Sequence, residues 1–289
     1  MSPHPTPVIL CSHGSTMMLG EDSSVGRFWQ AVGEQALKRG VEGVVFMGAH
    51  WEVGGSGVEI ASNPGKDHVK KQPVAWVEPS KYVDYEINSS PELADRVHAA
   101  LISHGVESKL NPNVEWIHDV FLVLSWMFPK SSIPVTLIST NAYYDPFLHV
   151  SIGAALRGLR YENILLVGTG GTVHNLYRNK WSNVVLHRDN FAQTSPPEDW
   201  ALQFRNEARD ALTMNTGPAL RRAALRLMRH PLYRDAHATD DHYAPVLFCA
   251  GAAGAVEDEG TVNVAPAEVW ELEQMCNTQF QFGEWEPLE

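Results

Sequence analysis

Residues 8–15 read VILCSHGS, an apolar run that ends in a histidine followed by a glycine. A short run of this kind, without polar alternation, is typical of a β-strand that is covered on both faces. Residues 43–51, GVVFMGAHW, repeat the pattern and end in His50 and Trp51. Ligands bind outside the carboxyl ends of strands in open α/β sheets. Two parallel strands would therefore place His13 and His50 at one edge of a sheet.

The rest of the chain alternates strand-like and helix-like patterns. Strands are expected at residues 7–11, 43–48, 58–62, 133–139 and 163–168, and helices at residues 25–39, 91–104, 120–127, 197–212, 218–229 and 239–251. This alternation predicts an α/β fold with a mainly parallel central sheet. Residues 63–89 form a long irregular segment, typical of a lid or binding loop. With no fixed-period repeat and no clear linker, we expect one domain over residues 1–289.

Composition excludes several classes of protein. The chain has 289 residues, 44% of them hydrophobic, which is enough for a full core. A net charge of −12, with residues 221–229 as the densest basic run, argues against nucleic-acid binding. The apolar runs are too short for a membrane span, and the N-terminus does not resemble a signal peptide. The three cysteines, Cys11, Cys249 and Cys276, are too scattered for a disulfide framework.

These features favour a cytoplasmic protein. They leave open whether it forms a homodimer, and whether Phe282 and Trp285 near the C-terminus pack on a neighbour or on the chain's own core.

Histidine is over-represented, with 13 residues, and three of them share one context. His13, His50 and His174 each follow an apolar run and lie beside glycine or tryptophan. Residues 163–176, NILLVGTGGTVHNL, lack both the GxGxxG spacing and a P-loop lysine, which argues against nucleotide binding. The shared context favours a common metal or acid/base site.

Two further clusters combine histidine and aspartate. His118 and Asp119 precede an apolar helix, and residues 237–242, HATDDH, surround the expected start of another. There Thr239 is expected to cap the helix, with Asp241 in its first turn, so capping alone explains this cluster. The remaining histidines are expected to be ordinary surface or core residues: His4, His68, His98, His104, His149, His187 and His230.

Three functions fit these residues. Three histidines and a water suit a zinc-dependent hydrolase, whereas two histidines and a carboxylate suit a non-haem Fe(II) oxygenase. A metal site with no open coordination position would instead indicate a non-catalytic metal-binding module. HExxH, GxSxG and SxxK motifs are absent from the sequence, so it carries none of these hydrolase signatures.

Five short segments, in order, resemble one enzyme family. SHGS (12–15), GAHW (48–51), HDVF (118–121), GGTVHNL (170–176) and HATDDHYAPVLFCAGAAG (237–254) resemble the class III extradiol ring-cleaving dioxygenases, in the DOPA-4,5-dioxygenase-like branch. The resemblance implies a three-layer α/β/α sandwich around a mainly parallel or mixed sheet. It also implies a mononuclear non-haem metal, Fe(II) or alternatively Zn(II), and cleavage of a catechol-type ring by O2 next to the diol, giving a semialdehyde.

The resemblance also assigns roles by position. His13, His50 and His242 match metal ligands, His174 matches a ligand or an acid/base residue, and His118 matches a histidine that contacts the substrate hydroxyl. Asp119 and Asp241 would orient imidazoles, or one of them would be a ligand. Substrate contact or support of the ligands is expected from three more residues: His237, Trp51 and Asn175.

The chain also departs from the family. Thr16 follows HGS where proline is usual, and HATDDH replaces HPTPEH. Residues 65–73, GKDHVKKQP, replace a loop that usually reads HDFxGFP and that is expected to shape the substrate pocket. The substrate therefore does not transfer. Lys66, Lys70 and Lys71 would suit an anionic substituent or simply a solvated loop.

Overall fold

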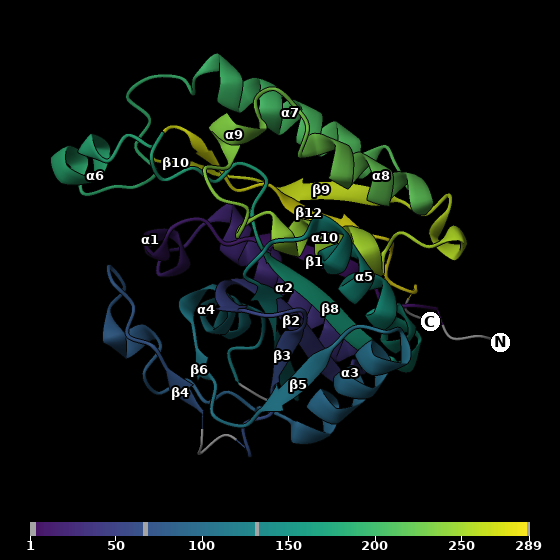
Figure 1. The fold of residues 1–289 in the computed structure, drawn as a ribbon. Helices are drawn as coiled ribbons and strands as arrows, with labels where there is room; N and C mark the ends of the chain where they lie inside the picture. The colour runs from purple at the N-terminus through teal and green to yellow at the C-terminus, as the bar shows by residue number, and fades with distance from the viewer. Residues whose placement is uncertain (1–3, 66–68, 131–132, 288–289) are drawn as a thin grey trace.

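The protein is built around one eight-stranded sheet, in the order β5-β3-β7-β2-β8-β1-β12-β9 (Figure 1). The computed structural model describes residues 4–65, 69–130 and 133–287. The strands are β1 (Val8–Ser12), β2 (Gly43–Val53), β3 (Val58–Ala61), β5 (Ser108–Asn111), β7 (Val135–Asn141), β8 (Ile164–Gly170), β9 (Asn263–Ala267) and β12 (Gln279–Phe282). The central strands β7, β2, β8 and β1 are parallel. The pairings β3–β7, β1–β12 and β12–β9 are antiparallel, so the sheet is mixed.

Helices cover both faces of this sheet. They are α1 (Thr16–Leu19), α2 (Ser24–Lys38), α3 (Pro91–Ser103), α4 (His118–Met127), α5 (Pro146–Leu156), α6 (Ser182–His187), α7 (Asp199–Thr213), α8 (Pro218–Leu227), α9 (Tyr233–Ala236) and α10 (Ala244–Ala252). Along β1, Val8 and Leu10 join the core under α3, α5 and α10, whereas Ile9 and Cys11 join the core under α2 and α4. Strands with apolar residues on both faces require this double covering. The predicted α/β/α sandwich is confirmed.

Two predicted boundaries near the histidines were wrong. Strand β2 was expected to end at Gly48 but continues to Val53, with a register shift between Met47 and Glu52, so His50 lies within it. Helix α10 was expected to begin with Thr239 as its cap but begins at Ala244. The Thr239 hydroxyl instead donates to Asp241, and the preceding residues form turns. Thr239, which we expected to be the helix cap, therefore lies in the loop before the helix.

The C-terminal part of the chain forms strands that we did not predict. Strand β12 pairs with β1, and β9 pairs with β12. Phe282 is fully buried in the core, and Trp285 packs against the core on the other face, with the Arg39 guanidinium 5.5 Å from its ring centroid. The tail therefore packs on its own core.

In the part that the structure describes, the long segment before α3 contains only short elements: β4 (Lys70–Lys71), paired with β6 (Glu115–Trp116), and a 3-10 turn at Pro79–Lys81. The Lys71 ammonium donates to the backbone carbonyls of Tyr82, Val83 and Tyr85, so this cation holds the loop together. Lys66 and His68 lie outside the described residues.

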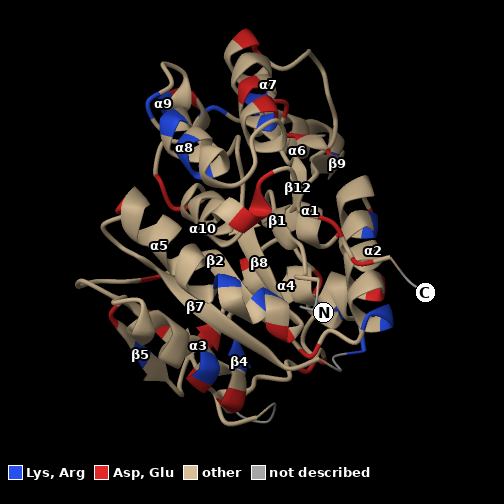
Figure 2. Cartoon of the chain, turned by 90° about the vertical axis from the view of Figure 1, so that its right-hand side faces the viewer, with Lys and Arg blue, Asp and Glu red and all other residues tan. Residues whose placement is uncertain are grey.

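Positions of charged residues are interspersed along the chain, with a group of Lys and Arg positions on α8, as the basic run 221–229 indicated (Figure 2). The three cysteines are free and buried. Among the described residues, no helix is long and apolar enough to cross a membrane. A second two-stranded pair, β10 (Trp270–Glu271) and β11 (Met275–Cys276), lies outside the main sheet.

Candidate metal centre and active site

Three histidines from three different elements converge on one point. The side chains of His13, His50 and His242 each offer a ligand nitrogen, and these nitrogens lie within 4.8 Å of one another. The ring centroid of His13 is 5.4 Å from that of His50 and 5.0 Å from that of His242. Three imidazole nitrogens gathered at this spacing are a candidate ligand set for a transition metal.

The end of β8 holds two of these histidines together. The His13 amide donates to the Gly170 carbonyl (3.1 Å), and the Gly171 amide donates to the His242 carbonyl (2.9 Å). A Cβ atom on Gly170 would lie 2.3 Å from the His242 carbonyl oxygen, and one on Gly168 would lie 2.6 Å from Cys249 Sγ. The glycines of β8 thus permit close packing of α10 and the turn before it, which explains them without a bound phosphate.

Asp119 fixes the irregular part of β2 that carries His50. One carboxylate oxygen of Asp119, fully buried, accepts hydrogen bonds from the amides of Ala49 (2.7 Å) and His50 (3.2 Å). A Cβ atom on Gly48 would approach that oxygen to 2.6 Å. Asp119 therefore acts on the backbone of the strand, and it positions His50 through its peptide group.

Asp241 orients the third imidazole. Its Oδ2 lies 3.0 Å from Nδ1 of His242, which leaves Nε2 of His242 buried and without a hydrogen-bond partner. A carboxylate on one ring nitrogen sets the tautomer and frees the other nitrogen for a metal. No carboxylate within the described ranges joins the convergent group, so the cluster is made of three histidines.

The unpaired nitrogens fit a metal ion. Both ring nitrogens of His13 are buried without a hydrogen-bond partner, which is costly unless something else satisfies them. Burial lowers the pKa of His13 well below its usual value, and burial, despite the nearby Asp119, lowers the pKa of His50 to about 4. Both rings are therefore neutral near pH 7, the form that coordinates metals.

His174 and His118 lie beside the three-histidine cluster without joining it. The His174 ring stacks on His242, with centroids 3.6 Å apart and planes at 9°, and its buried Nδ1 has no hydrogen-bond partner. His118 is the first residue of α4, and its ring centroid is 4.7 Å from that of His50. Burial lowers the pKa of both side chains. Two further neutral imidazoles thus lie beside the three-histidine cluster.

The other predicted site residues have supporting positions. His237 is fully buried; its Nε2 donates to the Thr172 carbonyl (2.9 Å), behind the turn that leads to His174. The Asn175 side chain binds the Asp235 carbonyl and the Tyr177 amide, which shapes the turn after His174. Trp51 is partly buried against the core on the α2 and α4 face.

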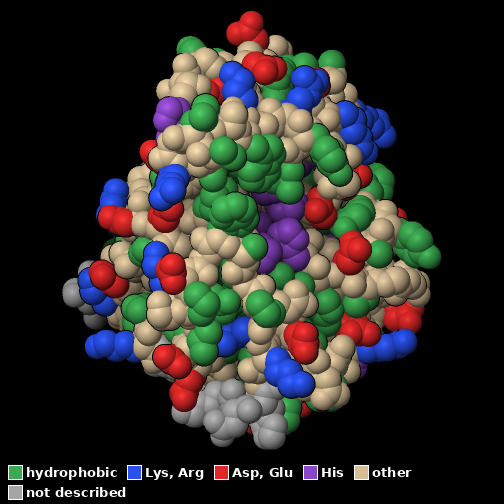
Figure 3. Space-filling model, turned by 90° about the vertical axis from the view of Figure 1, so that its left-hand side faces the viewer, with side chains coloured by type: hydrophobic (Ala, Val, Ile, Leu, Met, Phe, Trp, Pro, Cys, Tyr) green, Lys and Arg blue, Asp and Glu red, His purple; other side chains and the backbone are tan. Residues whose placement is uncertain are grey.

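A cavity of about 440 Å³ opens beside the histidines. Nine residues line it: His174, Asn175, Leu176, Tyr177, Trp181, Ala238, Thr239, Asp241 and His242. Figure 3 shows histidine side chains at the bottom of a hollow, with hydrophobic side chains along part of its rim. Leu176, Tyr177 and Trp181 were not predicted as site residues. The only sequence signal for them is the apolar and aromatic content of NLYRNKW, directly after His174.

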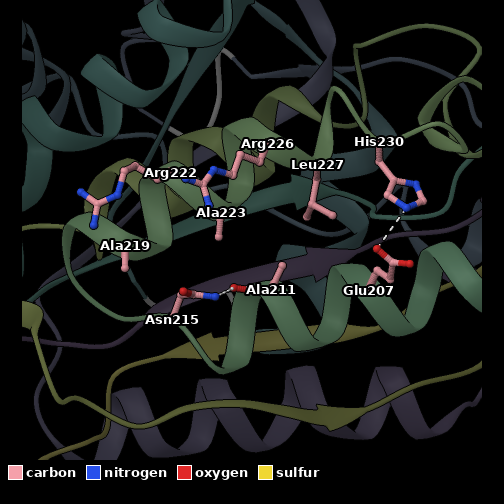
Figure 4. Close-up of a pocket in the computed structure, with 9 residues that line it drawn as sticks. All are labelled: Glu207, Ala211, Asn215, Ala219, Arg222, Ala223, Arg226, Leu227 and His230. Carbon is pink, nitrogen blue, oxygen red and sulfur yellow. Dashed lines mark hydrogen bonds and ion pairs between the residues drawn. The ribbon is translucent and has the colours of Figure 1, made fainter.

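Histidines expected to be ordinary have ordinary contacts. His149 is buried, with Nδ1 2.8 Å from the Asp145 carbonyl and Nε2 accepting from the Asn141 amide. Nε2 of His230 lies 3.0 Å from Glu207, in a separate cavity of about 540 Å³ between α7 and α8 (Figure 4). That cavity is lined mainly by alanines and arginines and holds no second histidine.

Comparison with known proteins identifies the family. Residues 1–282 match the model of the "Catalytic LigB subunit of aromatic ring-opening dioxygenase". The chain belongs to the LigB family. This LigB-family chain is 30% identical over 254 residues to "4,5-DOPA dioxygenase extradiol" of Escherichia coli (strain K12), covering 87% of each protein. It is 26% identical over 250 residues to the Beta vulgaris protein of the same name, covering 84% of this chain and 85% of that protein.

The fold of the LigB-family chain also has a solved counterpart. A crystal structure of an uncharacterized protein from Escherichia coli K12 matches with a TM-score of 0.75 and 25% identity, covering 96% of this chain and 100% of that one. Family and relatives together make the chain a ring-cleaving dioxygenase of the extradiol type, in the branch that the motifs indicated. They do not favour the zinc-dependent hydrolase that a three-histidine cluster also allows.

Proposed function

We propose that the chain is an Fe(II)-dependent extradiol dioxygenase that opens a catechol-type ring next to the diol and yields a semialdehyde. Residues 1–289 would act as a single catalytic domain. The observation that carries the proposal is the cluster of His13, His50 and His242, whose nitrogens lie within 4.8 Å of one another and include three buried nitrogens without partners. A ferrous ion held there would lower the pKa of the diol hydroxyls and activate O2.

The chain's own residues would do the rest. Asp241 keeps the proton of His242 on Nδ1, so that Nε2 remains available as a ligand. Asp119 holds the backbone of His50 in place. Both carboxylates are engaged with other groups, which supports three histidine ligands over a set of two histidines and a carboxylate.

His174 and His118 are proposed as the acid/base residues. His174 lies outside the convergent group and lines the cavity, so its ring is placed to take a proton from a diol hydroxyl and to return it later. His118, beside His50, is placed to hold the second hydroxyl as a hydrogen-bond acceptor. Neutral imidazole near pH 7 suits both tasks.

The test combines metal analysis with oxygen consumption. Protein reconstituted anaerobically with Fe(II) is mixed with aerated buffer and a panel of catechols, while an O2 electrode and the absorbance of a yellow product are followed. We expect O2 uptake in step with product, about one Fe per chain, and no turnover with Zn(II) in place of Fe(II). Absence of uptake with every catechol, or full turnover without O2, contradicts the proposal.

The His13→Ala variant tests the ligand set, with His104→Ala as its control because His104 is exposed at the end of α3. We expect His13→Ala to lose bound metal and His104→Ala to keep it.

A further inference from the structure

One wall of the cavity beside the histidines is apolar and open. Leu176, Tyr177 and Trp181 line it and are 45%, 87% and 43% exposed. The Trp181 indole N–H donates to the Leu176 carbonyl (3.0 Å), so the two ends of this wall are joined. Large apolar side chains left open beside a reaction site are typical of a surface that contacts a ligand. We call these three residues the apolar wall.

Two cationic residues, Arg178 and Lys180, lie between the residues of the apolar wall in the sequence, and both are paired with carboxylates. Arg178 forms an ion pair with Asp235, and the Lys180 ammonium lies 2.6 Å from a carboxylate oxygen of the buried Glu273. Both charges lie between Leu176 and Trp181 in the sequence but are engaged by carboxylates. Neither is left to receive an anionic group of a ligand.

The remaining charge at the cavity is negative. Asp241 lines it with a side chain that is 24% exposed, and none of the nine lining residues is lysine or arginine. The Tyr144 hydroxyl donates a hydrogen bond to Glu52. Burial and Glu52 are the main causes of the raised pKa of Tyr144, and the negative charge of Asp241 also contributes to it. In Figure 3, hydrophobic and acidic side chains border the histidine hollow.

Resting on the proposed function, we propose that the site selects catechols with an uncharged, apolar substituent and discriminates against those that carry a carboxylate. The apolar wall would pack against the substituent while the diol faces the histidines. A carboxylate there would lie near Asp241, with no lysine or arginine among the nine lining residues to compensate its charge, at a cost that a low local dielectric increases. Lys71, which would suit an anionic substituent, instead binds three backbone carbonyls of its own loop.

The first experiment compares three catechols of similar length. 4-Propylcatechol is neutral, dopamine carries an ammonium group, and 3,4-dihydroxyphenylpropionate carries a carboxylate. With the Fe(II) enzyme, we expect kcat/KM for the propionate to be at least about tenfold below that for 4-propylcatechol, with dopamine between them. Raising the ionic strength from about 0.05 to 0.5 M should narrow the gap between dopamine and the propionate. Equal or better turnover of the propionate overturns the proposal.

The second experiment tests the apolar wall with a matched pair of leucines. Leu176 lines the cavity, whereas Leu186 on α6 is 73% exposed and does not. We expect Leu176→Ala to lower kcat/KM for 4-propylcatechol about tenfold, mainly through KM, and to leave unsubstituted catechol nearly unchanged. Leu186→Ala should match the wild type with both. Equal losses with both catechols mean that Leu176 does not contact the substituent.

Trp181→Phe and Trp181→Ala separate ring contact from loop support. Phenylalanine keeps an aromatic face but loses the hydrogen bond to the Leu176 carbonyl. If the wall contacts the substituent, Trp181→Phe keeps most of the preference for 4-propylcatechol and Trp181→Ala loses it. If both variants keep the preference, Trp181 is not part of the recognition surface.

Binding without turnover distinguishes a failed specificity from a failed function. Anaerobic calorimetry with the Fe(II) protein measures the affinity of each catechol, whether or not a ring is opened. Tighter binding of 4-propylcatechol than of the propionate, with no ring cleavage, would support the selectivity and reject the proposed function. Ring cleavage together with tighter binding of the propionate would support the proposed function and reject the selectivity.

Discussion

At the scale of single residues, the site depends on two aspartates that contact groups other than a metal. Asp241 contacts the ring of His242, and Asp119 contacts the backbone amides of Ala49 and His50. In the proposed site, both carboxylates would therefore position nitrogens and would not be ligands themselves. Partners of this kind commonly affect metal affinity almost as strongly as the ligands do.

Replacing Asp119 tests this positioning role. Asp119→Ala removes the acceptor of two buried amides, so we expect metal affinity to fall about 10- to 100-fold. Asp119→Asn keeps an oxygen at the same place and should restore most of the affinity. Competition with a chelator gives the dissociation constants. Equal losses in both variants would show that the carboxylate charge, and not the acceptor, is what matters.

His174 is expected to affect rate more than metal binding. Because its nitrogens lie outside the convergent group, His174→Ala should retain its iron and its affinity for catechol. Loss of a general acid/base should lower kcat by about 10²- to 10⁴-fold. Stopped-flow measurement of product formation, with iron content determined on the same sample, checks both. Loss of iron in this variant would make His174 a ligand.

At the scale of elements, the ends of β1, β2 and β8 and the turn before α10 form one unit. Glycines make this possible, because Gly170 has no side chain where the His242 carbonyl packs. The distance between these two elements thus sets the distance between His13 and His242, two of the proposed ligands.

Gly170→Ala should separate these elements. Its Cβ would lie 2.3 Å from a backbone oxygen, which cannot move like the end of a side chain. We expect a loss of about 1–3 kcal/mol in stability together with weaker metal binding. Gly54→Ala is the control, because a Cβ there meets nothing within 4 Å and its φ is not positive. Urea unfolding and metal titration should leave the control unchanged; the same metal affinity in Gly170→Ala would argue against this coupling.

The sequence predicted the central elements because their residues act locally. Continuous apolar runs marked β1 and β8, and their C-terminal histidines could be grouped by the geometry of parallel sheets. Strand β12 escaped prediction because four residues that alternate glutamine and phenylalanine are too few to distinguish from coil. The prediction that Thr239 caps the helix was wrong because its hydroxyl forms a hydrogen bond with Asp241 instead. The apolar wall depends on tertiary packing, which no local pattern encodes.

At the scale of the whole molecule, a buried carboxyl links the N-terminal site loop to the C-terminal region. Oε2 of Glu271 accepts hydrogen bonds from the Ser15 amide (3.2 Å) and the Asn277 side chain (2.8 Å), while Oε1 is buried without a partner. Burial raises the pKa of Glu271 to about 7. The folded protein therefore keeps a proton that the unfolded chain loses near pH 4.5.

This proton makes global stability depend on pH. Since the folded pKa lies above the unfolded one, the contribution of Glu271 to stability is greatest below about pH 4.5 and falls as pH rises towards 7, by at most about 1.4 kcal/mol per pH unit. Glu271→Gln removes this titration, so the variant should gain relative to the wild type between pH 5 and pH 8. Urea unfolding of both metal-free proteins across that range measures the difference; a growing advantage of the wild type would contradict it.

The position of β1 between β8 and β12 has a consequence for biosynthesis. His13 directly follows β1, yet this strand has its partners far along the sequence, at residues 164–170 and 279–282. The side chain of Gln279 also binds both backbone groups of Ser12, just before His13. During synthesis, β1 therefore lacks one partner until β8 has been made and the other until β12 follows. In the proposed site, firm metal binding through His13 would therefore have to wait until β12 has paired with β1.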